Sequence, residues 1–173
     1  MAAPASHRLD LLVLPPSLDQ GRAALEPLLR AWEALPGGPV EGGCIALAVE
    51  PAPGSAPPPA EPLRFVANRQ GGFRVRCPDT GANVVPRFNA AVTAWRDAQA
   101  RAPDATDHRA LRALDCPCGR RHDLVALDYH PPAGFARAWI VLREVADPAL
   151  RPEAQALAER LLGGAPSVLY RRG

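Results

Sequence analysis

Proline and glycine divide this chain of 173 residues into short segments, and this division limits the folds that it can adopt. Proline fixes φ and removes a backbone hydrogen-bond donor, so it rarely lies inside a helix or a central strand. The chain has 21 prolines and 14 glycines. Several stand at the ends of apolar runs, as in Pro15-Pro16, Pro36-Gly37-Gly38 and Gly163-Gly164. We therefore expect short helices and strands rather than a few long ones.

Apolar runs and alternating patterns of four to eleven residues predict seven strands. The expected strands cover residues 9–14, 44–49, 63–66, 73–76, 124–129, 135–145 and 167–171. Turn-forming residues at 68–72 predict that the third and fourth strands form a hairpin. The fifth and sixth strands are expected to form a second hairpin with a longer connection.

Apolar residues at helical spacing predict three helices. The first is expected after Ser17-Leu18-Asp19-Gln20, which has the form of a capping box, and Pro27 inside it predicts a kink or a later start. The second is expected over 86–100, and the third from Asp147-Pro148 to Gly163-Gly164. The order of elements predicts an α+β fold, with a mixed or antiparallel sheet and the three helices packed mainly on one face. We expect one domain over 1–173, with a proline-rich flexible loop at 51–62.

Composition excludes several functional classes. All 20 basic residues are arginine, which is typical of a GC-rich genome, and we expect a bacterial source. The net charge is only +2 and the arginines are spread along the chain, which argues against a nucleic-acid partner. No apolar run approaches the ~20 residues of a membrane span, and Leu11–Leu14 is too short for a signal-peptide core. These features predict a cytoplasmic protein, in which four cysteines are more typical of metal ligands or buried thiols than of disulfides.

One group of residues has the composition of a metal site. Cys116-Pro117-Cys118-Gly119 is a short turn that brings two sulfurs together, and His122 follows four positions after Cys118. Zinc prefers thiolates and imidazoles in a tetrahedral arrangement. Cys77, at the start of another glycine-containing turn, supplies a fourth donor. The predicted site is therefore a structural zinc bound by Cys77, Cys116, Cys118 and His122, with no open coordination position.

The two turns resemble the CPxCG knuckles of zinc ribbons. The residues that carry the resemblance are Cys77-Pro78-Asp79-Thr80-Gly81 and Cys116-Pro117-Cys118-Gly119, about ten residues within the segment 77–122. The resemblance implies a knuckle-like turn pair around zinc. Thr80 stands where the first knuckle would have its second cysteine, and the second knuckle is one residue shorter than the pattern.

Three alternatives to a closed zinc site stay open. Cys77 could lie elsewhere, leaving an open site of Cys116, Cys118 and His122 with Asp123 or Asp128 as a base. The turns could also hold no ion, which Thr80 favours. Cys116 and Cys118 could instead form a redox-active disulfide.

The motifs outside the cysteine turns indicate which class of function the sequence favours. The sequence contains no serine nucleophile elbow, phosphate loop or dinucleotide fingerprint. It therefore favours a small non-enzymatic binding or adaptor protein, of an immunity or accessory type. Such a protein would have a protein partner, and the loop Tyr129–Phe135 is a candidate contact surface. The alternative is a small zinc-dependent hydrolase or transferase. Asp128 and His130 share one face of the expected strand, as a base and its orienting carboxylate would.

Overall fold

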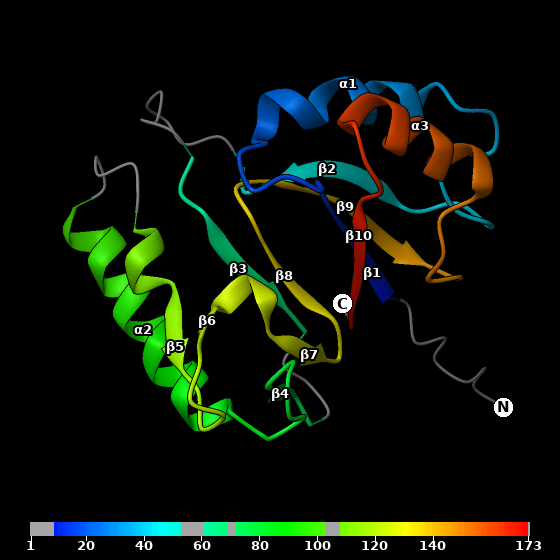
Figure 1. Cartoon of the computed structure of the whole chain (residues 1–173). Coiled ribbons are helices and arrows are strands. Elements are labelled where there is room, and N and C mark those ends of the chain that lie inside the picture. The colour runs from blue at the N-terminus through cyan, green and yellow to red at the C-terminus, as the bar shows by residue number, and fades with distance from the viewer. Residues whose placement is uncertain (1–8, 53–60, 69–71, 103–107, 173) are drawn as a thin grey trace, which may run out of the picture. The chain divides into compact units, whose positions relative to one another are not determined.

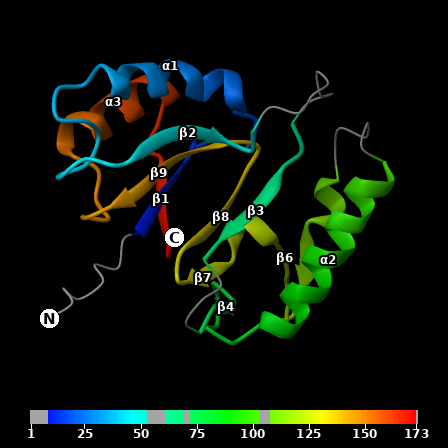
Figure 2. The same ribbon diagram turned by 180° about the vertical axis from the view of Figure 1, so that it is seen from behind.

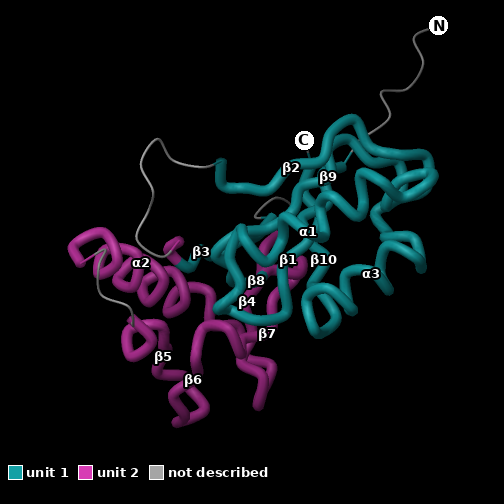
Figure 3. The backbone as a smooth tube through the Cα atoms, turned by 90° about the horizontal axis from the view of Figure 1, so that it is seen from above, with its two compact units in different colours: residues 1–55, 63–68, 134–173 teal, residues 56–62, 69–133 magenta. Residues whose placement is uncertain are grey.

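The computed structural model describes residues 9–52, 61–68, 72–102 and 108–172. It has an α+β fold with three α-helices and antiparallel sheets, as the sequence predicted (Figure 1). The chain divides into two compact units (Figure 3): unit 1 comprises residues 1–55, 63–68 and 134–173, and unit 2 comprises residues 56–62 and 69–133. A single domain over 1–173 stays a prediction. Most of the predicted flexible loop at 51–62 lies outside the described residues.

Unit 1 is a four-stranded antiparallel sheet with two helices on one face. Its strands, in spatial order, are β10 (Ser167–Arg172), β1 (Leu9–Leu14), β9 (Trp139–Val145) and β2 (Ala46–Glu50). The helices α1 (Arg22–Glu33) and α3 (Pro152–Leu162) pack side by side over this sheet (Figures 1 and 2).

Strand β1 is apolar from Leu11 to Leu14 because both of its faces are buried there. Leu11 and Val13 belong to the core beneath α1 and α3, whereas Leu12 and Leu14 belong to a second cluster on the opposite face. That second cluster also takes Val66 and Ala136 from the pair of strands β3 (Arg64–Ala67) and β8 (Ala133–Ala136). A strand that is covered on both faces is expected to lose the alternation of polar and apolar residues.

Unit 2 is built from one helix and very short elements. They are β4 (Arg74–Arg76), α2 (Val85–Arg101), the 3-10 turn η1 (Arg109–Leu111), β5 (Ala113–Asp115), β6 (Arg121–Asp123), the 3-10 turn η2 (Leu124–Ala126) and β7 (Asp128–His130). Strand β4 pairs with β7, and β5 pairs with β6. Helix α2 packs against β4 and β5, and the rings of Phe73, Phe88 and Tyr129 contact one another with centroids 5.6–6.2 Å apart.

The predicted hairpin of residues 63–66 and 73–76 is wrong. Both strands exist, but β3 pairs with β8 and β4 pairs with β7. The alternation along β4 is as expected, because Val75 is buried and both neighbouring arginines are exposed. Alternation identifies a strand and its buried face, whereas the partner is decided by contacts with residues far away in the sequence.

The second predicted hairpin is also wrong. Residues 124–126 are the 3-10 turn η2, and β7 begins only at Asp128. The buried side chains of this segment are Leu124, Leu127 and Tyr129. Residues 135–145 divide into β8 and β9, and β9 pairs with β1 and β2 rather than with β7.

Two helix starts differ from the prediction. Ser17 to Gln20 form a separate turn, in which the Gln20 side chain accepts a hydrogen bond from the Ser17 N–H, and α1 begins later, at Arg22. Pro27 lies inside this helix rather than at its start. Helix α3 begins at Pro152 instead of Pro148, since Leu150 forms a β-bridge with Val40. Gly163 ends α3 as predicted, with a φ of 76°.

Candidate metal centre

The first knuckle follows directly on β4. The N–H of Cys77 donates to the carbonyl of Ala82 at 2.9 Å, and the N–H of Gly81 donates to the carbonyl of Cys77 at 2.8 Å. Gly81 has a φ of +69°, a conformation that glycine adopts without strain. The turn therefore reverses the chain tightly and leaves the side chain of Cys77 at the end of the β4–β7 pair.

The second knuckle connects β5 to β6 and repeats this hydrogen-bond pattern. The N–H of Cys116 donates to the carbonyl of Arg120 at 2.8 Å, and the N–H of Gly119 donates to the carbonyl of Cys116 at 3.0 Å. Strand β6 then carries His122 back alongside Leu114 of β5. One hairpin thus supplies three of the four predicted ligands.

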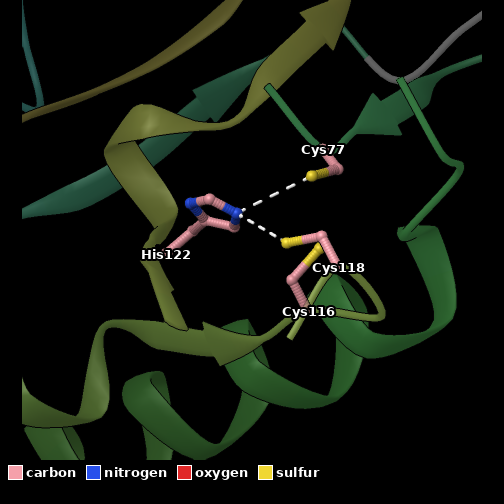
Figure 4. A group of neighbouring side chains, drawn as sticks. All are labelled: Cys77, Cys116, Cys118 and His122. Atoms are coloured by element: carbon pink, nitrogen blue, oxygen red, sulfur yellow. Dashed lines mark hydrogen bonds between the residues drawn. The ribbon is translucent and has the colours of Figure 1, made fainter. Parts of the chain in front are cut away.

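The structure brings all four predicted donors together (Figure 4). The ligand atoms of Cys77, Cys116, Cys118 and His122 all lie within 4.8 Å of one another. The Nε2 atom of His122 lies 3.3 Å from the sulfur of Cys118 and 3.7 Å from that of Cys77. A tetrahedral zinc ion, with Zn–N of ~2.0 Å and Zn–S of ~2.3 Å, separates nitrogen from sulfur by about 3.5 Å. The donor set therefore fits zinc in both chemistry and spacing.

Thr80 supports a ligand instead of replacing one. Hydrogen bonding from its hydroxyl favours the thiolate form of Cys77, and the backbone of Thr80 and Asp79 and the thiol of Cys116 act in the same direction. These bonds outweigh burial, which acts in the opposite direction, and lower the pKa of Cys77 to about 6. Sequence reasoning treated Thr80 only as a missing cysteine and so overlooked this role. The signal for it was the position of a hydroxyl residue in the turn, three residues after Cys77.

The pKa of Cys116 is shifted in the opposite direction to that of Cys77. The backbone N–H of Cys118 donates to its sulfur and lowers the pKa, but burial and the adjacent sulfurs of Cys77 and Cys118 raise the pKa of Cys116 to about 11. Neighbouring thiolates repel each other, so these sulfurs do not readily all lose their protons. A divalent cation among them would offset this repulsion.

The other candidate groups lie in different environments. Asp123 forms a two-point ion pair with Arg112, at 2.9 and 2.8 Å, and its carboxylate also accepts from the N–H of Val125 at the start of η2. The hydrogen bond from Arg112 holds the pKa of Asp123 below its usual range, although burial alone would raise it. Asp128 and His130 contact each other at 3.1 Å as predicted, and both side chains are more than half exposed.

Two minor expectations need correction. Tyr129 and Phe135, which we expected on an exposed loop, are both buried, and the hydroxyl of Tyr129 donates to the carbonyl of Leu124. Cys44, expected within a buried strand, is half-buried and precedes β2. It packs against the core of unit 1 and has no part in the group of four donors in unit 2.

Comparison with known proteins identifies no relative of this chain. No protein-family model, no curated protein and no solved structure matches the chain. Within the part of the chain that the structure describes, no helix is both long and apolar enough to cross a membrane. Functional inference therefore begins from the geometry of the four donors.

Proposed function

We propose that this chain is a small bacterial binding or adaptor protein of the cytoplasm, with a structural zinc bound by Cys77, Cys116, Cys118 and His122. The observation that carries the zinc site is the convergence of these four donors within 4.8 Å, from two turns and one strand. Three thiolates and one imidazole satisfy a tetrahedral ion completely. Zinc is favoured over harder divalent ions because thiolates are soft ligands.

The shortness of the elements in unit 2 supports a structural role for the ion. Strands β4, β5, β6 and β7 have three residues each, about half the length of an average strand. Their ladders contain few hydrogen bonds, so an ion that joins the end of β4 to the β5–β6 hairpin would stabilise the unit substantially. Binding of a structural ion is itself a source of folding free energy.

A closed donor set also supports the adaptor over the zinc-dependent hydrolase or transferase. Metal-assisted hydrolysis needs a coordination position for water or substrate, and in the proposed site Cys77 would fill the fourth position. Asp123, one of the two expected bases, is already engaged by Arg112 and by the N–H of Val125. Asp128, the other, is paired with His130.

For the protein partner we propose a contact surface at the start of the β5–β6 pair. Leu111 and Val125 are 48% and 37% exposed. The N–H of Leu124 donates to the carbonyl of Arg112, and Leu111 and Val125 are the chain neighbours of these two residues. The two exposed apolar residues therefore lie on neighbouring segments. Exposed apolar groups of this kind are common at the centre of protein contacts.

Metal analysis of matched cysteine variants tests the zinc site. We expect one zinc per chain in the unmodified protein and in C44S, because Cys44 lies in unit 1 outside the donor group. We expect C77S to lose most of its zinc and the stability of unit 2. Equal zinc content in C77S and C44S would contradict the four-ligand site. A bound metal that keeps an exchangeable water in the unmodified protein would favour the enzyme instead.

A further inference from the structure

The four donors differ in burial. Cys77 and Cys116 are only 1% and 6% exposed. Cys118 is half-buried, and the side chain of His122 is 11% exposed. The edge of the cluster between Cys118 and His122 is therefore its less buried side.

A fifth side chain with a metal-binding oxygen lies at that same edge. The Oδ2 atom of Asp79 is 3.5 Å from Nε2 of His122 and 4.0 Å from the sulfur of Cys118. These separations are close to those between two ligands of one tetrahedral ion, about 3.3 to 3.8 Å for the bond lengths of zinc. A small movement of the carboxylate would bring it into coordination range.

Asp79 is held in place weakly. Its partner Arg120 lies at 3.4 Å, and the two side chains are 37% and 74% exposed. Exposed ion pairs of this kind contribute little, about 0–1 kcal/mol, so the carboxylate can leave the guanidinium at small cost. The backbone of Asp79 stays anchored in the first knuckle, because the N–H of Gly81 donates to the carbonyl of Cys77 across this turn at 2.8 Å.

We propose that Asp79 is a fifth metal-binding residue, whose carboxylate binds the ion at the less buried edge of the site when His122 is not coordinated. This proposal rests on the proposed zinc site. In it, the ion exchanges through an intermediate held by three thiolates and one carboxylate oxygen, a donor set that remains compatible with zinc. Asp79 thereby retains the ion while His122 opens and closes, and Arg120 takes back the carboxylate when His122 returns.

Titration with Co²⁺ and competition with a chelator for Zn²⁺ test the proposal in variants that lack His122. We expect H122A to bind Co²⁺ with the absorption bands of three thiolate ligands, more weakly than the unmodified protein. Adding D79N to H122A should weaken binding by at least about tenfold more, as is found when supporting groups of metal sites are lost. In the background with His122 intact, D79N should have a smaller effect, so that the double-mutant cycle shows coupling between the two residues.

Asp115 supplies the matched control. It is an exposed aspartate that precedes Cys116. Asp79 contacts both His122 and Cys118, whereas among the described residues no hydrogen bond or ion pair joins the carboxylate of Asp115 to a donor. D115N removes the same charge near the same ion. We therefore expect H122A with D115N to bind like H122A alone. If D79N and D115N weaken H122A equally, the carboxylate acts only through its charge and Asp79 is not a ligand.

If H122A does not fold, the proposal can still be tested by measuring the rate of zinc release from proteins that keep all four ligands. We expect D79N to release Zn²⁺ to excess chelator several-fold faster than the unmodified protein, and D115N to release it at the unmodified rate. Equal release rates in all three proteins would overturn the proposal. Failure of the zinc site itself is distinguishable, since the unmodified protein would then bind neither Zn²⁺ nor Co²⁺.

Discussion

Hydrogen bonding from the side chain of Thr80 is the largest influence on the pKa of the Cys77 thiol, and it lowers that pKa. In a knuckle with two cysteines, the position of Thr80 would hold a metal ligand. Here His122, from strand β6, completes the set of donors, and Thr80 stabilises the thiolate of Cys77 in the first turn. The departure from the zinc-ribbon pattern is thus compensated within the same hairpin that carries Cys116 and Cys118.

We expect T80V to weaken zinc binding by about tenfold, the lower end of the range for lost outer-shell hydrogen bonds. Valine keeps the shape of threonine but cannot donate to the sulfur. T80S keeps the hydroxyl and should bind like the unmodified protein. Competition with a chromophoric chelator measures all three affinities. Equal affinities for T80V and T80S would show that the hydroxyl has no effect on the metal.

Removal of the metal by a chelator should loosen unit 2 selectively. If the proposed ion is bound, the three-residue strands of unit 2 depend on it, whereas unit 1 has a continuous sheet and its own apolar core. Amide hydrogen exchange followed by mass spectrometry should show loss of protection over 113–123 and unchanged protection over 139–145. Unchanged exchange in both segments would mean that the ion does not stabilise unit 2.

Gly119 should be replaceable by asparagine at a smaller cost than by alanine. Its φ is +85°, and a Cβ added there would meet no atom within 4 Å. The cost of G119A is therefore backbone strain alone, about 1–2 kcal/mol of unfolding free energy. Asparagine tolerates this conformation better, so G119N should lose less. Denaturant unfolding of the zinc-loaded proteins compares them, and identical losses would indicate a steric cause.

Arg112 and Asp123 should show a coupling free energy of about 2 kcal/mol. Their two-point contact is partly buried, with side chains 10% and 26% exposed, and hydrogen bonds between charged groups are worth about 1.5–3 kcal/mol. R112M and D123N should each destabilise unit 2, and the double variant should lose less than the sum of the two. Purely additive losses in denaturant unfolding would mean that the two side chains do not stabilise each other.

Much of the site was predictable because its signal is local. The spacing of Cys116, Cys118 and His122 within one turn and one strand required no knowledge of the fold, and Cys77 was identified by a similar glycine-containing turn. The role of Thr80 was not predictable in the same way. It depends on the direction of one hydroxyl within the turn, which residue type alone does not determine.

The fold shows the same division between local and distant information. Strand β1, helix α2 and the end of α3 at Gly163 follow from periodicity and capping, and the structure has them as expected. Strand partners were predicted wrongly because turn residues near Asn68 favour a local hairpin, whereas β4 pairs with β7 more than fifty positions away. Pairing of that kind depends on the packing of the whole unit.

The sequence order of the two units has a consequence for how such a chain can change over evolutionary time. Residues 69–133 leave unit 1 after β3 and return to it at β8, and these two strands are hydrogen-bonded neighbours. The segment that carries the four donors is thus an insertion between paired strands, and the four-stranded sheet contains none of it. We expect a gene in which a short turn replaces this segment to encode a chain that still forms the sheet and its two helices, as circular dichroism and amide exchange would show. Loss of all protected structure would instead make the inserted segment a requirement for folding.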